Sequence, residues 1–148
     1  YILHIYLTNM IYSELISGLW ISDVEMLNKS KFLEDNNIAI ILNCTQMFDF
    51  PKNDDIIKIR LPFSPIRESD TDISLLRNNY KKIVDYISEK IDENNILICC
   101  YDGKSISPFI VALYIATKSK ISKESVYEIL LTKNKDLDLW CDLSLFIN

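Results

Sequence analysis

The stretch that decides the fold runs from Ile96 to Pro108 and reads ILICCYDGKSISP. Its first five residues are apolar, as in a β-strand that is covered on both faces. A tight loop containing Gly103 follows, and Ser107 with Pro108 predicts a helix start, with Ser107 as the N-cap and Pro108 as the first helical residue. A strand, a short glycine loop and a helix N-terminus in this order are typical of an anion-binding loop, because backbone N–H groups converge there.

Cys100 stands where the predicted strand ends and the loop begins. Loop amides at this place would stabilise a thiolate, lower its pKa and make Cys100 a nucleophile. The same position also suits a buried structural cysteine before an ordinary strand-to-helix turn. The loop alone leaves both interpretations open.

The rest of the chain alternates between strand and helix patterns, and this alternation predicts an α/β domain. We expect a central, mostly parallel five-stranded sheet flanked by helices. Strands are expected at 15–21 (a short strand or hairpin), 38–44, 56–61 and 96–100. Helices are expected at 22–32, at 71–91 with Thr71 or Asp72 as the cap, from the loop to about Thr117, at 122–133 and at 137–146.

The composition of the 148 residues fits one domain spanning 1–148 and excludes several kinds of site. Two glycines exclude a glycine-rich nucleotide loop, and a single histidine excludes a histidine triad or a multi-histidine metal site, so we expect no metal and no cofactor. A net charge of -5 without a basic cluster argues against binding to nucleic acid or to an anionic membrane. Four cysteines without C-x-x-C spacing favour a reducing, intracellular and cytoplasmic setting.

The opening segment is apolar but is not expected to be a signal peptide or a membrane span. It contains His4, Glu14 and other polar residues, and it has no basic start. Residues 1–12 are expected to form an accessory helix.

Residues 99–107 resemble the signature loop of the cysteine-based protein phosphatases, His-Cys-x-x-Gly-x-x-Arg-Ser, with Cys100, Gly103 and Ser107 in register. The small dual-specificity phosphatases are similar over nearly the whole chain, at 16–21, 38–45, 72–74 and 107–115. The resemblance implies their fold, with Ser107 helping the thiolate to leave. It also implies a phosphate-binding loop made of Tyr101, Asp102, Gly103, Lys104, Ser105, Ile106 and Ser107.

Two departures from the family pattern weaken the expected chemistry. Ile106 stands where the family has its arginine, and it cannot make a bidentate contact to phosphate oxygens or offset the charge of the transition state. That loss alone is expected to nearly abolish hydrolysis. Cys99 stands where the family has a histidine, which removes part of the hydrogen-bonding scaffold and puts thiolate formation at Cys100 in doubt.

The general acid is a third departure. In the family this aspartate lies about five residues before the start of the long helix, and counting back from Asp72 gives Arg67. Glu68 and Asp70 are the nearby alternatives, and the whole segment also reads as a solvated, charged loop. Arg67 or Lys104 could instead supply the cation that is missing at position 106.

The leading hypothesis is a catalytically inactive or strongly impaired phosphatase-like protein, a pseudophosphatase, that binds a phosphoprotein or another protein partner. The alternative is an active cysteine-dependent phosphatase, with Cys100 as the nucleophile, Glu68 or Asp70 as the acid, and Lys104 with backbone amides in place of arginine. Some viral members of the family dimerise through an N-terminal helix, so the resemblance implies a homodimer through residues 1–12. The richness in Ile, Asn and Lys fits a viral member.

Overall fold

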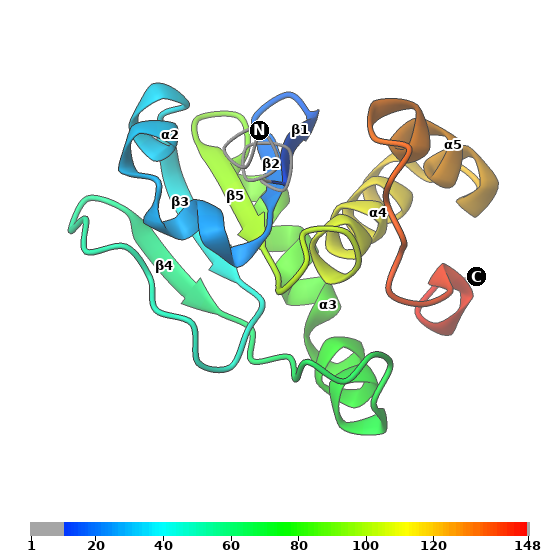
Figure 1. The fold of residues 1–148 in the computed structure, drawn as a ribbon. Coiled ribbons are helices and arrows are strands. Elements are labelled where there is room, and N and C mark those ends of the chain that lie inside the picture. The colour runs from blue at the N-terminus through cyan, green and yellow to red at the C-terminus, as the bar shows by residue number, and fades with distance from the viewer. Residues whose placement is uncertain (1–10, 148) are drawn as a thin grey trace, which may run out of the picture.

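The computed structural model describes residues 11–147, which form a five-stranded sheet in the order β1-β2-β5-β3-β4 (Figure 1). β1 is antiparallel to β2, and all other neighbouring strands are parallel. The mostly parallel sheet expected from the sequence is therefore confirmed. The strands are β1 (Tyr12–Ile16), β2 (Leu19–Ser22), β3 (Ile38–Asn43), β4 (Ile57–Arg60) and β5 (Asn95–Cys99).

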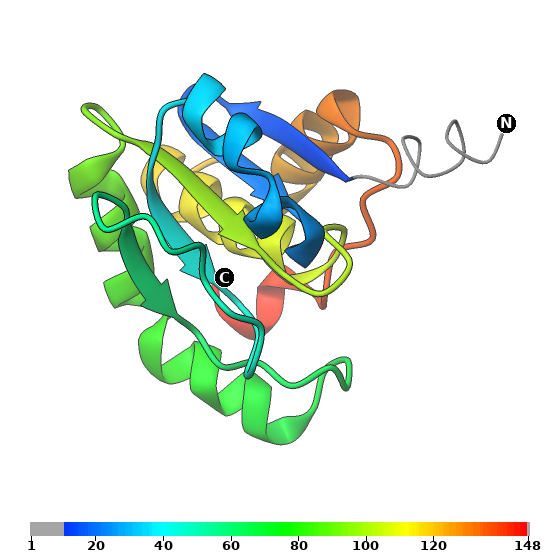
Figure 2. The ribbon, with the colours of Figure 1, turned by 60° about the vertical axis from the view of Figure 1, so that its left-hand side comes forward.

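Helices cover both faces of the sheet (Figures 1 and 2). One face carries α3 (Asp70–Lys90) and α4 (Ile106–Ser119), with α5 (Lys123–Lys133) packed beside α4. The other face carries the 3-10 helix η1 (Val24–Asn28) and α2 (Ser30–Asp35). Ile96 and Ile98 of β5 belong to the first core cluster and Leu97 to the second, which explains the uninterrupted apolar run of this strand.

Two predicted helices differ from the structure, one in its continuity and one in its first residue. The helix expected at 22–32 is divided into η1 and α2 by Lys29, whose backbone is not helical. α3 begins at Asp70 rather than at Thr71, because Ser69 is the N-cap and its Oγ accepts a hydrogen bond from the Asp72 N–H at 3.2 Å.

The helix predicted at 137–146 is wrong, since only Leu143–Leu145 (η2) is helical there, as a short 3-10 turn. The Trp140 ring packs against Phe63 and Phe109, with centroid distances of 5.5 and 5.8 Å. The carbonyls of Leu139 and Trp140 accept hydrogen bonds from the guanidinium of Arg67 instead of from a helix. These tertiary contacts hold residues 134–142, here called the C-terminal segment, in an irregular, non-helical path.

The predicted accessory helix and the homodimer through it lie outside the described residues, except that Tyr12 begins β1. Within residues 11–147, none of the helices combines the length and the apolar character needed to cross a bilayer. All four cysteines are free and buried.

Candidate functional site

The signature loop, residues 100–105, leaves the carboxyl end of β5 and enters α4 at the edge where the parallel strands end (Figure 1). The Cys100 N–H donates to the Ser22 carbonyl at 3.1 Å, which continues the pairing with β2. Gly103 has a φ of +70°, and a Cβ at this position would lie 2.7 Å from the backbone nitrogen of Asp23. Only glycine therefore fits between the loop and the end of β2.

Cys100 lies at the base of the loop and is 1% exposed. Its Sγ lies 3.2 Å from the Oγ of Ser107. The predicted helix cap is wrong, however, because α4 begins at Ile106 and Ser105 is its N-cap. Ser107 is thus the second helical residue, and its hydroxyl faces the thiol rather than the end of the helix.

The carboxylate of Asp102 turns back into the loop. Its Oδ1 accepts hydrogen bonds from the Lys104 N–H at 2.9 Å, the Ser105 N–H at 3.2 Å and the Ser105 hydroxyl at 3.0 Å. The Cys100 Sγ lies 3.6 Å from the same oxygen. Two backbone N–H groups that an anion-binding loop would offer to a phosphate are therefore bound to the chain's own carboxylate.

The pKa of Cys100 is raised above its usual value, first because burial disfavours the thiolate and further because of the negative charge of Asp102. Hydrogen bonds with Ser107 and with the backbone of Gly103 lower this pKa but do not reverse the direction of the shift. Of the two interpretations that the loop left open, this direction agrees with the buried structural cysteine and not with the activated nucleophile. Cys100 is consequently a thiol at neutral pH, which is not the form that attacks phosphorus.

Iodoacetamide at pH 7.5 is expected to leave Cys100 unmodified in the native protein, because the thiol is both protonated and buried. Its modification should rise only at a pH above that at which an exposed cysteine ionises, because the pKa of Cys100 is raised. Peptide mapping by mass spectrometry measures this, with urea-unfolded protein, in which all four cysteines react, as the control. Selective alkylation of Cys100 at pH 7.5 would show that a thiolate is present.

Ile106, at the position of the family's arginine, is 4% exposed and belongs to the main hydrophobic cluster together with Cys100 and Phe109. Its side chain packs inward instead of offering a charge at the loop. The base of the loop is therefore apolar, and two of the loop N–H groups are bound by Asp102.

The guanidinium of Arg67 binds the C-terminal segment. It donates to Asp138 Oδ2 at 2.7 Å and to the carbonyls of Leu139 and Trp140 at 2.5 and 3.2 Å. These contacts raise the pKa of Arg67 and lower that of Asp138. The Asp138 N–H in turn donates to the Lys104 carbonyl at 2.9 Å, so the segment borders the loop. Arg67 thus lies near the loop but is held by other partners.

The two predicted acids lie on the surface beside α3. Glu68 has a positive φ of 55° and a half-exposed side chain 3.8 Å from Arg67, and Asp70 is exposed at the first turn of α3. Among the described residues, no hydrogen bond or ion pair joins either side chain to the signature loop.

Asp72 is a residue whose structural role the sequence reading missed. It is 2% exposed, and its Oδ2 accepts a hydrogen bond from the Ser64 hydroxyl at 2.6 Å. Both carboxylate oxygens also accept from the Ser64 N–H at 3.2 Å. The carboxylate thereby fixes the segment before α3. The Ser69-x-x-Asp72 spacing resembles a capping box, and it could have indicated from the sequence that Asp72 has a structural role.

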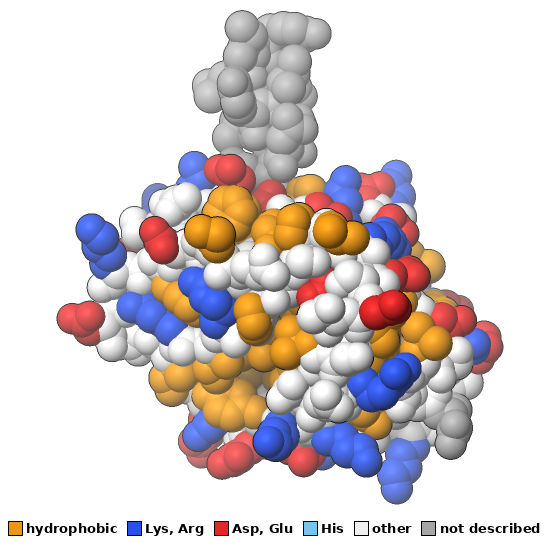
Figure 3. Space-filling model, turned by 90° about the horizontal axis from the view of Figure 1, so that it is seen from below, with side chains coloured by type: hydrophobic (Ala, Val, Ile, Leu, Met, Phe, Trp, Pro, Cys, Tyr) orange, Lys and Arg blue, Asp and Glu red, His pale blue; other side chains and the backbone are white. Residues whose placement is uncertain are grey.

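Tyr101 joins the two segments that border the loop. Its hydroxyl donates to the Phe63 carbonyl at 2.7 Å and accepts from the Gln46 N–H at 3.1 Å. The Tyr101 ring makes an edge contact with the Phe48 ring. Met47, which precedes Phe48 in the chain, is 86% exposed. Figure 3, which views the edge where the parallel strands end, shows apolar side chains across the middle of this face.

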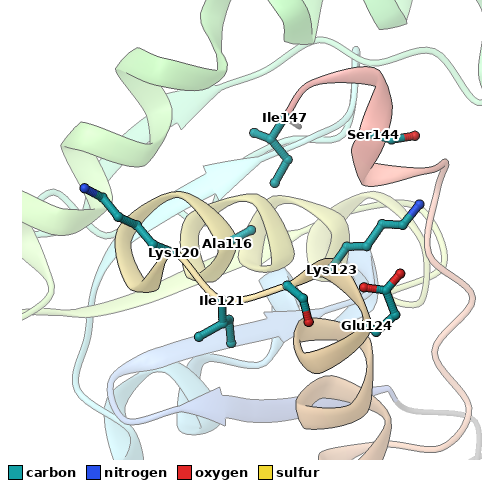
Figure 4. A pocket seen from close by; sticks show the side chains of 8 residues that line it. Ala116, Lys120, Ile121, Lys123, Glu124, Ser144 and Ile147 are labelled. Atoms are coloured by element: carbon teal, nitrogen blue, oxygen red, sulfur yellow. The ribbon is translucent and has the colours of Figure 1, made fainter.

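A pocket of about 500 Å³ lies away from the loop, between the end of α4, the start of α5 and η2. Figure 4 shows Ile147 reaching toward Ala116 and Lys120 extending away. None of its lining residues belongs to the signature loop. Within residues 11–147, no group of three or more His, Cys, Asp or Glu side chains could hold a metal ion.

The structure thus combines a mostly parallel sheet, a cysteine that follows the central strand β5 and a glycine loop that leads into α4. The structure resembles a mouse putative dual specificity phosphatase solved with zinc tungstate, with a TM-score of 0.75 and 14% identity over 90% of this chain and 80% of that one. DUSP15 matches with a TM-score of 0.75 and 18% identity over 90% and 81% of the two chains.

A third similar structure is the human tyrosine phosphatase-like serine/threonine/tyrosine-interacting protein, with a TM-score of 0.74 and 12% identity over 91% of this chain and 90% of that one. No family model matches the sequence, and no curated protein matches it. The chain therefore has the dual-specificity phosphatase fold, as the resemblance of its loop implied.

Proposed function

We propose that this protein is a catalytically inactive member of the dual-specificity phosphatase fold, a pseudophosphatase, which acts by binding a protein partner without turning it over. The observation that carries the proposal is the hydrogen bonding of Asp102 to the N–H groups of Lys104 and Ser105. A phosphate oxygen would have to displace this carboxylate and would meet its negative charge.

Two further features support the loss of catalysis. Ile106 offers no charge to a phosphoryl group, whereas catalysis of phosphoryl transfer depends on electrostatic stabilisation of the transition state. The raised pKa of Cys100 keeps the thiol protonated. The alternative of an active enzyme would need both a thiolate and a replacement cation, and Arg67 is bound to Asp138.

A binding role is supported by the intact fold around the loop. Tyr101, Gly103 and Asp72 each make specific contacts that keep the loop and its borders in place. One structural neighbour carries "phosphatase-like" and "interacting protein" in its name. The partner of the present chain is accordingly a protein, phosphorylated or not.

Turnover of 4-nitrophenyl phosphate tests the proposal. The parent protein and its Cys100→Ser variant are expected to release nitrophenol at the same background rate. Calorimetric titration with vanadate should show no heat of binding up to about 1 mM vanadate. A dissociation constant of about 1 mM corresponds to a binding free energy of about −4 kcal/mol. A rate that falls in Cys100→Ser would establish an active enzyme instead.

A further inference from the structure

An apolar groove lies between β4 and α3, on the side of the sheet opposite to α2. Its volume is about 240 Å³, below the range of about 300 to 1,000 Å³ that is usual for small-molecule sites. Leu42, Ile59 and Leu61 form its floor, and Asn79, Lys82, Ile83 and Tyr86 of α3 form its wall. The groove therefore has room for one or two aliphatic side chains rather than for a cofactor.

The strand beside this groove is an edge strand. β4 pairs only with β3, and it ends the sheet (Figures 1 and 2). The Leu61 N–H donates to the Asn43 carbonyl, so by alternation Ile57 and Ile59 also face β3, while the backbone groups of Lys58 and Arg60 point outward. Among the described residues, no backbone hydrogen bond reaches these outward groups.

Apolar and charged side chains of β4 lie on opposite faces of the sheet. Ile57 and Ile59 alternate onto the α3 side, where Ile57 is 49% exposed although it is apolar. Lys58 is exposed on the opposite side, and Lys82 lies on the wall of the groove. Neither lysine forms an ion pair with the described residues, and no carboxylate lines the groove.

We propose that this edge and groove, here called the β4 groove, bind an extended segment of a partner protein in which apolar and acidic residues alternate. The segment adds a strand to β4, places its apolar side chains in the groove and turns its carboxylates toward Lys58. A second copy of the chain fits less well, because antiparallel pairing of two β4 strands would set Lys58 of one copy near basic side chains of the other. The inference does not depend on whether the signature loop is catalytic.

Titration of 15N-labelled protein with the blocked peptide Ac-GEVEVEVG-NH2 tests the proposal. The amide signals of Lys58 and Arg60 are expected to shift, with saturation below about 1 mM. The basic peptide Ac-GKVKVKVG-NH2 should bind about tenfold more weakly, because its lysines face Lys58. Absence of shifts at these amides at about 1 mM acidic peptide would overturn the proposal.

Two variants locate the peptide. Ile57→Asp and Lys58→Glu are each expected to weaken its binding about fivefold to tenfold, because the first places a charge beside its apolar side chains and the second faces its carboxylates. The matched variants Ile129→Asp and Lys133→Glu change exposed residues of α5 and should bind like the parent. Equal binding by all four variants would contradict the site. A concentration-dependent dimer in sedimentation that Ile57→Asp abolishes would assign the groove to a second copy and also refute the proposal.

Discussion

Replacing Ile106 with arginine and Asp102 with alanine in one variant is expected to create phosphatase activity that the parent protein lacks. Asp102→Ala frees the N–H groups of Lys104 and Ser105 and removes one charge that raises the pKa of Cys100. Arginine at position 106 supplies a bidentate cation for the phosphoryl oxygens. Because one well-placed oxyanion donor is worth about 10²- to 10³-fold in rate, we expect turnover at least about 100-fold above background.

The substrate for this measurement is 4-nitrophenyl phosphate, since its leaving group departs without the proton that a general acid would supply. Adding Cys100→Ser to the double variant should return the rate to background. The variant with Ile106→Lys and Asp102→Ala is the matched control, because lysine carries the same positive charge but cannot bind two phosphoryl oxygens in a bidentate manner. Thermal unfolding of each variant checks that the buried position tolerates the change. A folded double variant at background rate would show that another feature of the loop, such as Cys99 in place of the family's histidine, also blocks catalysis.

Truncating Trp140 to alanine is expected to lower the free energy of unfolding by about 3 to 5 kcal/mol, the range observed for large aromatic residues in protein cores. Trp140 is 1% exposed, and its ring contacts both Phe63 and Phe109. Phe63 precedes α3 and Phe109 lies in α4, so this ring joins the C-terminal segment to two other parts of the core. Urea unfolding at pH 7, with the midpoint and slope fitted together, measures the loss.

Phe48→Ala is the matched control for this prediction. The Phe48 ring is 48% exposed and has an edge contact with Tyr101, so its loss should cost about 1 kcal/mol or less. A loss below about 1.5 kcal/mol for Trp140→Ala would mean that the C-terminal segment is not anchored by this ring.

Local sequence patterns were sufficient to predict the α/β class, the mostly parallel sheet and the position of the loop. These features depend on local patterns: the apolar runs at 38–43 and 96–99 require cover on both faces, and Gly103 marks the turn. The loss of the family's arginine could also be predicted from the sequence, because the arginine position lies at a fixed number of residues after Cys100 and is occupied here by Ile106. Where a helix starts was less certain, since Ser69, Thr71 and Asp72 are all good caps.

The binding partners of the charged and hydroxyl side chains depend on tertiary packing and could not be predicted from local patterns. Asp102 turns into the loop and Arg67 turns to the C-terminal segment, although both read as groups free to face a phosphate or solvent. Ser105, rather than Ser107, occupies the N-cap position of α4, and the Ser107 hydroxyl lies beside Cys100. Sequence spacing fixes which residues share a loop, but the partner of a polar group depends on which donors and acceptors from distant segments the packed core brings within hydrogen-bonding distance.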